Sequence, residues 1–273
     1  MNKLAEKVQQ ALVAAINNDD LVLPTLPEVA LNIRQAAENP EISISDLSKV
    51  IGRDTALSAR LIKVVNSPLL RATQEVTDLH TAITRLGTNY SSNLAIGLVM
   101  EQIFHARSEA VEQKMRDVWR RSLEVAGVSY ALCRSHSQLK PDQAALGGLV
   151  HQIGVLPILT YAEDHYELLS DPVSLNHVID SIHPFLGDKL LHGWDFPEML
   201  ASLPGQYMNL ERDSASLDYI DLVQVAVLYC HRGTDHPLAS VPASNLPAVK
   251  KLRVDPYSEA LRAELDEARS MFY

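Results

Sequence analysis

Apolar residues recur every three or four positions along most of the chain, with polar residues between them. Near the start, for example, Val8, Leu12 and Ala15 fall on one side of a helix. The same spacing predicts helices at about residues 1–16, 27–38, 44–51, 55–67, 78–87, 88–104, 111–136, 143–162, 174–182, 183–194, 196–203, 218–231 and 256–271. No convincing strand pattern occurs, so the sequence predicts an all-α protein.

Residues at the ends of these segments support the prediction. Ser43 and Asp46 have the spacing of a capping box, and Asp54 and Asp78 stand where a carboxylate caps a helix start. Gly87 follows an apolar segment as a C-terminal cap. Pro157 is expected to end or kink the apolar segment 143–162. The chain has only 11 glycines, which also favours helices over sheets with tight hairpins.

A polar stretch near residue 110 lacks apolar periodicity and marks the best boundary within the chain. We place the boundary near residue 108. The sequence then predicts two packed helical subdomains, residues 1–108 and 109–273, with small residues such as Ser91, Ser92 and Gly97 indicating close helix contacts.

Composition excludes several classes of function. The 24 Lys and Arg against 34 Asp and Glu give a formal net charge of −10, which argues against nucleic acid or an anionic membrane as a partner. We expect no membrane-spanning run and no signal peptide, and hence a cytoplasmic protein. Cys133 and Cys230 are too few for a disulfide framework and are expected in the core. The sequence has neither a Walker loop nor a Rossmann glycine pattern.

Two passages carry a longer pattern. The first is an ordered set consisting of Leu26-Pro27, Asp54, Leu57-Ser58, Arg60-Leu61, Asn66-Ser67, Ala82-Ile83 and Leu86-Gly87. The second comprises Trp119 with Ser122, then GGLVHQIG at 147–154 and GDKLLHGWDFP at 187–197. Together they resemble the HDOD family, regulatory relatives of the HD-type metal-dependent phosphohydrolases, over about residues 20–232. The resemblance implies that the C-terminal subdomain is HD-like and that the protein acts in signal transduction.

The resemblance also allows each position of an HD metal site to be compared with this chain. Such a site needs a first His, an adjacent His-Asp pair and a later Asp, because imidazoles and carboxylates bind a divalent cation that activates water. Here Arg121 stands at the first position, and the pair reads His151-Gln152. The segments 204–207 and 222–227 supply no matching ligand. We therefore expect a degenerate site with no metal, no cofactor and no catalytic residue.

Other groups give weaker hypotheses. Arg121 is expected either to replace the positive charge of the lost ion, by pairing with an internal acid or a phosphate, or to point into solvent. His183 and His192 lie on different faces of a helix and do not form a paired site, and the Cys230-to-His236 segment matches no zinc pattern. A surface of Arg53, Arg60 and Lys63 could meet an acidic partner, although solvation of an ordinary helix surface is the favoured explanation.

The leading hypothesis is a non-catalytic regulatory module that binds a signalling protein or a small ligand. Its functional surface is expected in the cleft between the subdomains, with Arg121, His151 and Gln152 on the HD-like side. One alternative is a metal-dependent phosphohydrolase with unrecognised ligands. Another is a scaffold or homodimer in which helix 1–16 or 256–271 docks on a second chain.

Overall fold

The computed structural model describes residues 3–18, 23–70, 73–255 and 258–273. Within these ranges the protein is helical and contains no strand. The α-helices are α1 (Lys3–Asn17), α2 (Glu28–Ala37), α3 (Ile44–Ile51), α4 (Thr55–Val65), α5 (Leu79–Leu86), α6 (Thr88–Val99), α7 (Glu109–His136), α8 (Pro141–Val150), α9 (Val155–Glu163), α10 (Tyr166–Leu169), α11 (Pro172–Gly193), α12 (Glu198–Ala201), α13 (Leu203–Gln206), α14 (Tyr219–His231), α15 (Pro247–Leu252) and α16 (Glu259–Ala268). The 3₁₀ helices are η1 (Met100–Ile103), η2 (Pro237–Ser240) and η3 (Ala243–Asn245). The all-α prediction is confirmed.

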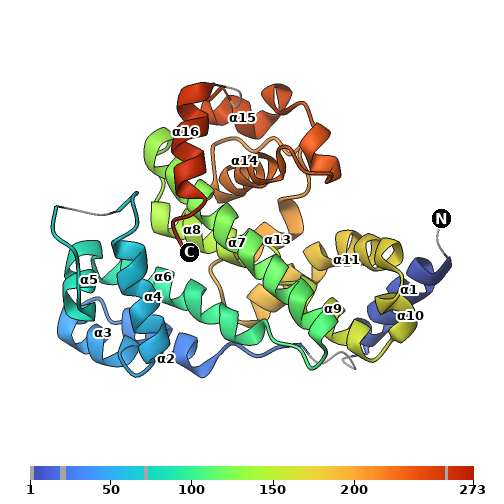
Figure 1. Cartoon of the computed structure of the whole chain (residues 1–273), viewed down its shortest axis with the longest axis horizontal. Coiled ribbons are helices and arrows are strands. Elements are labelled where there is room, and N and C mark those ends of the chain that lie inside the picture. The colour runs from blue at the N-terminus through green and yellow to red at the C-terminus, as the bar shows by residue number, and fades with distance from the viewer. Residues whose placement is uncertain (1–2, 19–22, 71–72, 256–257) are drawn as a thin grey trace.

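The long helix α7 runs through the middle of the molecule (Figure 1). It packs against α8, α9, α14 and α16, while α6 reaches the same centre by packing on α8. Helices α2 to α6 gather on one side of α7, and α14 to α16 lie on another (Figure 1). α1 packs on α10 and α11, away from α2 to α6. The first two residues of the predicted helices 1–16 and 256–271 lie outside the described residues.

Side chains that precede the helices satisfy free N–H groups of the first turn, as predicted. The Asp54 carboxylate accepts from the Leu57 N–H at 2.9 Å, and the Asp78 carboxylate accepts from the Thr81 N–H at 2.8 Å. The Ser43 hydroxyl accepts from the Asp46 N–H at 3.0 Å. Local hydrogen bonds between neighbours in sequence thus fix where α3, α4 and α5 begin.

Small residues let helices approach closely. Ser91 and Ser92 on α6 are buried, and a Cβ placed on Gly97 would lie 2.4 Å from a Leu149 methyl of α8. A Cβ on Gly148 would lie 2.5 Å from the Ala126 Cα of α7. These approaches confirm the close helix contacts predicted around Gly97, and they bring α6, α7 and α8 into one core.

Three local predictions differ from the structure. Pro157 does not end its segment, because the chain turns at residues 151–154 and Pro157 lies in the first turn of α9, where its missing N–H costs little. α11 continues through Pro184, joining two segments that the pattern separates. The polar stretch near residue 110 is the start of α7, with Ser108 as its N-cap.

One apolar segment passes the length and composition test for a membrane span, although the sequence pattern predicts none. It is Pro141–Glu163, and 83% of its most apolar window is buried inside the protein. The turn at 151–154 interrupts it. The segment is therefore part of the protein core, and its apolar character follows from packing on α7, α6 and α14.

Candidate functional site

Arg121 lies on α7 with 27% of its side chain exposed. Its guanidinium donates to the Cys230 carbonyl at 2.7 Å and to the Glu124 carboxylate at 2.7 Å. Glu124 also accepts from Arg269, which directly follows α16, at 2.9 Å. Of the two sequence predictions for Arg121, the ion pair with an internal acid is the one the structure contains, and the guanidinium joins α7 to the end of α14.

His151 stands at the C-terminal end of α8 and is buried. Its Nδ1 donates to the Gly148 carbonyl at 2.7 Å. Burial, together with the nearby His183, His231 and Arg121, lowers the pKa of His151 to about 3. The imidazole is therefore neutral near pH 7. His151 is thus a buried, hydrogen-bonded residue at the end of α8.

Tyr207 fills the space beside His151 and Gln152. The Tyr207 ring meets the His151 ring edge to face at 5.1 Å, and its hydroxyl is hydrogen-bonded to Gln152. The same hydroxyl lies 2.6 Å from His183 Nε2, while His183 Nδ1 donates to the Ile179 carbonyl at 2.7 Å. Nε2 must then accept, so the Tyr207 hydroxyl donates to His183 and the Gln152 amide donates to Tyr207. Burial lowers the pKa of His183 to about 4.

A second pair of histidines borders this group. The rings of His231, at the end of α14, and His236 stack at 3.9 Å, and burial lowers the pKa of His231 to about 4. His236 lies close enough to Asp180 of α11 for their charges to interact, while burial raises the pKa of the Asp180 carboxyl. His231 Nδ1 is buried and has no hydrogen-bond partner among the residues that the structure describes. These residues extend the group around Arg121 to α11 and α14.

The residues present do not fit a metal ion of the HD type. A neutral amide, Gln152, holds the position of the bridging carboxylate, and the Arg121 guanidinium places a positive charge beside the histidines. Among the described residues, no three or more His, Cys, Asp or Glu side chains are grouped so that they could hold a metal. The Tyr207 hydroxyl and His183 Nε2 are hydrogen-bonded to each other.

The cleft between the two predicted subdomains is present but is lined by other residues. Arg34 of α2 borders three adjoining hollows, which also contact α6, α8 and the 189–197 region. Trp194 Nε1 donates to the Pro24 carbonyl at 3.1 Å across the same region. Arg121, His151 and Gln152 do not line these three hollows, so the prediction that they lie on this cleft is wrong. They lie around Tyr207 instead.

The predicted basic surface is divided. Arg53 and Lys63 are exposed, but the Arg60 guanidinium pairs with Glu101 and donates to the Leu98 carbonyl at 3.1 Å. It also lies 5.9 Å from the Trp119 ring centre. Burial lowers the pKa of Arg60, and Glu101 partly offsets this effect. Arg60 therefore joins α4 to α6 and α7, and it is not an open cation for a partner.

Sequence reasoning missed Tyr207, His183 and Asp180 as members of the group around His151. His177, Asp180 and His183 are spaced three residues apart, which places them on one face of α11. That spacing was the available signal. Nothing in the sequence indicates that Tyr207 meets this face. The predictions for His192 and the two cysteines agree with the structure. His192 lies apart from His183 and pairs with Glu198 and Asp188, and both cysteines are buried.

Comparisons with known proteins support one family. The pattern that defines the HDOD domain matches residues 23–206. The fold is similar to the crystal structure of a "Putative metal-dependent phosphohydrolase" from Shewanella amazonensis SB2B, with 28% identity, 98% and 99% of the two chains covered and a TM-score of 0.85. It is also similar to an HDOD domain protein of unknown function from Geobacter sulfurreducens, with 19% identity, 97% of each chain covered and a TM-score of 0.71.

A relative from Treponema pallidum (strain Nichols), an uncharacterized protein, is 27% identical over 185 residues, which are 64% of this chain. The match covers 36% of that relative, so the chain spans about a third of its length. Because the family pattern matches more than half of the sequence and a solved HDOD protein shares the helical fold, the chain belongs to the HDOD domain family.

Proposed function

We propose that this protein is a non-catalytic signalling module that acts by binding a protein partner or a small ligand. The observation that carries the proposal is the Arg121 guanidinium, which bonds to the Cys230 carbonyl and Glu124 where an HD enzyme has its first metal ligand. A fixed guanidinium cannot be deprotonated in a protein, so its charge opposes a divalent cation at any working pH.

The neighbouring residues support the same proposal. The Gln152 amide and the His183 imidazole converge on the Tyr207 hydroxyl, so their hydrogen bonds replace the bonds that metal ligands would make. Tyr207 is almost fully buried, and burial raises the pKa of its hydroxyl, which keeps it a neutral donor. Such a network stabilises the fold without ordering a nucleophilic water.

A metal-dependent phosphohydrolase is the second candidate. It is favoured by the 28% identity to the protein from Shewanella amazonensis SB2B. In this chain its ligands would have to come from His183 and Asp180 of α11, from His231 of α14 and from His236, which follows α14, all near His151 or Arg121. This set offers neutral imidazoles, which bind transition metals, but it has a single carboxylate beside a fixed guanidinium.

Metal analysis and a phosphodiesterase assay distinguish the two candidates. Protein purified without chelators is incubated with Mn²⁺, Fe²⁺ or Ni²⁺, desalted and analysed for metal, then assayed with bis(p-nitrophenyl) phosphate. We expect much less than one ion per chain and no hydrolysis above buffer. Stoichiometric metal together with hydrolysis would contradict the proposal. The doubly substituted protein Arg121→His, Gln152→Asp, which restores two ligand types, shows whether the assay detects metal uptake in this fold.

The role of Arg121 is tested separately through stability. Arg121→Met removes hydrogen bonds to a carbonyl and a largely buried carboxylate, and it is expected to lower the free energy of unfolding by about 1.5–3 kcal/mol. Arg120→Met on the same helix removes one exposed pair with Asp117 and serves as the control. Urea unfolding measures both. Equal effects of the two substitutions would show that Arg121 does not replace the ion's charge.

A further inference from the structure

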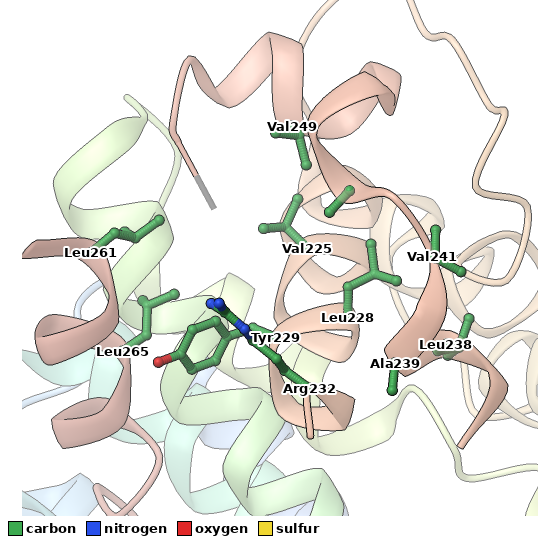
Figure 2. A pocket seen from close by; sticks show the side chains of 11 residues that line it. Val225, Leu228, Tyr229, Arg232, Leu238, Ala239, Val241, Val249, Leu261 and Leu265 are labelled. Atoms are coloured by element: carbon green, nitrogen blue, oxygen red, sulfur yellow. The ribbon is translucent and has the colours of Figure 1, made fainter. Parts of the chain in front are cut away.

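A pocket lies among α14, α15, α16 and the two 3₁₀ helices η2 and η3, with a cavity volume of about 80 Å³. Figure 2 shows side chains from these elements converging on this space. Its apolar wall consists of Val225, Leu228, Leu238, Ala239, Val241, Ala243, Val249, Leu261 and Leu265.

Leu228 lines the pocket with an apolar side chain. This side chain is only 7% exposed. Leu228 therefore presents its apolar surface to the pocket. A molecule with an apolar body would complete the contacts that this side chain lacks.

The pocket also has a defined polar end. Tyr229 and Arg232 are its two polar lining residues, and Arg232 carries the single charge among the described residues that line it. The Tyr229 hydroxyl is held by α16, at 2.8 Å from Asp266 Oδ1 and 3.0 Å from the Arg262 carbonyl. Arg232 is exposed and also interacts within the protein, but a guanidinium has five N–H donors and can bind an anion in addition.

We propose that this pocket binds a small amphipathic anion, with an extended apolar body against Leu228 and Val249 and a single carboxylate at Arg232. Charge supports the anion, because the lining has one positive side chain in a protein whose net charge is −10. A straight hydrocarbon chain fits the composition of the wall, because Tyr229 and Arg232 are the only polar residues among the described residues that line it.

The pocket is separate from the group around Tyr207. Val225 and Leu228 of α14 line the pocket, whereas His231 of the same helix does not. The proposal therefore goes beyond the proposed function and does not depend on whether the Tyr207 region hydrolyses phosphodiesters. α14 borders both places, so a bound anion would contact the helix that also carries the Cys230 carbonyl held by Arg121.

Isothermal titration calorimetry of the full chain with hexanoate, octanoate and decanoate, each below its micelle concentration, tests the proposal. We expect one site per chain and an affinity that rises about fourfold for each added methylene. 1-Octanol has the same carbon number as octanoate without the charge, and it is expected to bind about fivefold more weakly. Absence of heat with all three carboxylates would overturn the proposal.

Three variants locate the site. Arg232→Gln is expected to weaken octanoate binding about fivefold, whereas Lys250→Gln removes an exposed charge beside Val249 and leaves the affinity unchanged. Ala239→Phe extends a side chain into the empty volume and is expected to abolish binding, with circular dichroism confirming the fold. The proposal is overturned if Arg232→Gln acts no more strongly than Lys250→Gln, or if folded Ala239→Phe binds octanoate normally.

Discussion

At the scale of single residues, the histidines around Tyr207 are held in the neutral form. Burial lowers the pKa of His151 to about 3 and the pKa values of His183 and His231 to about 4, from a usual value of 6.5. The exposed His192 behaves in the opposite way, because hydrogen bonds to the Asp188 carbonyl and Glu198 raise its pKa. Protonating the buried group therefore requires the fold to open.

These shifts predict that the protein loses stability on acidification. The unfolded chain protonates its histidines near pH 6.5, while the folded chain keeps His151 neutral to about pH 3. Between those values the unfolded state binds more protons, so stability is full above pH 6.5 and falls as the pH is lowered. Each such histidine contributes a slope of about 1.4 kcal/mol per pH unit.

Urea unfolding of the wild type and of His151→Gln, measured from pH 7 to 5, checks this expectation. The free energy of unfolding is expected to depend less steeply on pH in the variant, and the difference corresponds to about one bound proton. The same substitution at exposed His80 is the control. A His151→Gln slope equal to that of the wild type would mean that His151 is protonated in the folded state.

Residue roles were predictable where the partner is near in sequence. Asp54 and Leu57 are three residues apart, so the cap can be read from the sequence. Arg121 has one such partner, Glu124, and another, the Cys230 carbonyl, 109 residues away. Likewise, Tyr207 meets His183 only because α11 and α13 pack together. No local pattern reports these distant contacts.

At the scale of elements, the helices around α7 are held at distances that only glycine allows. Gly148 of α8 lies against the Ala126 backbone of α7, and a Cβ on Gly127 of α7 would lie 2.0 Å from the Ala268 carbonyl of α16. Backbone cannot move aside as a flexible side chain can. The position of α7 between α8 and α16 therefore depends on these two residues.

Gly148→Ala is expected to destabilise the protein by about 3 kcal/mol or more, because its methyl group would overlap the Ala126 backbone. Gly193→Ala is the matched control, since a Cβ there meets nothing within 4 Å. A helical Gly→Ala change without a clash is neutral or stabilises by up to about 1 kcal/mol. Thermal unfolding of both variants measures the difference. Similar melting temperatures would disprove the close α7 to α8 contact.

Apolar periodicity predicted where the main helices lie, but it did not predict where two of them begin or end. Pro184 lies inside α11, where local rules predict a break, and burial of Ile182, His183 and Leu186 keeps the helix continuous. The turn at 151–154 contains no proline. It occurs where Gly154 packs so closely on α11 that a Cβ added to it would lie 2.0 Å from the His183 carbonyl oxygen. In both places packing between distant segments overrides local preference.

At the scale of the whole molecule, the two predicted subdomains share one hydrophobic core. The continuous core includes residues of α2 to α6 as well as residues of α7 to α16. α6 covers Leu146 and Leu149 of α8, and α1 lies on α10 and α11 of the second half. The boundary near residue 108 stays a prediction about chain organisation, and the shared core has its own consequence for unfolding.

We expect the full chain to unfold in one cooperative transition. Unfolding residues 1–108 alone would expose the buried face of α8, so neither half keeps its core without the other. Scanning calorimetry should therefore give equal calorimetric and van't Hoff enthalpies. Leu149→Ala, at a fully buried position, is expected to lower the melting temperature of that single transition by about 5–15 °C, since it costs about 2–5 kcal/mol.

Met199→Ala removes a side chain that is 54% exposed and is the control, with little expected change. Two resolved transitions, of which Leu149→Ala shifts only one, would contradict this expectation and show two independently folding units. A single transition that moves as a whole would instead mean that the two halves share one folding equilibrium. Binding at α2 to α6 and binding at α14 to α16 would then both act on that equilibrium, because α6, α8 and α7 connect the two regions.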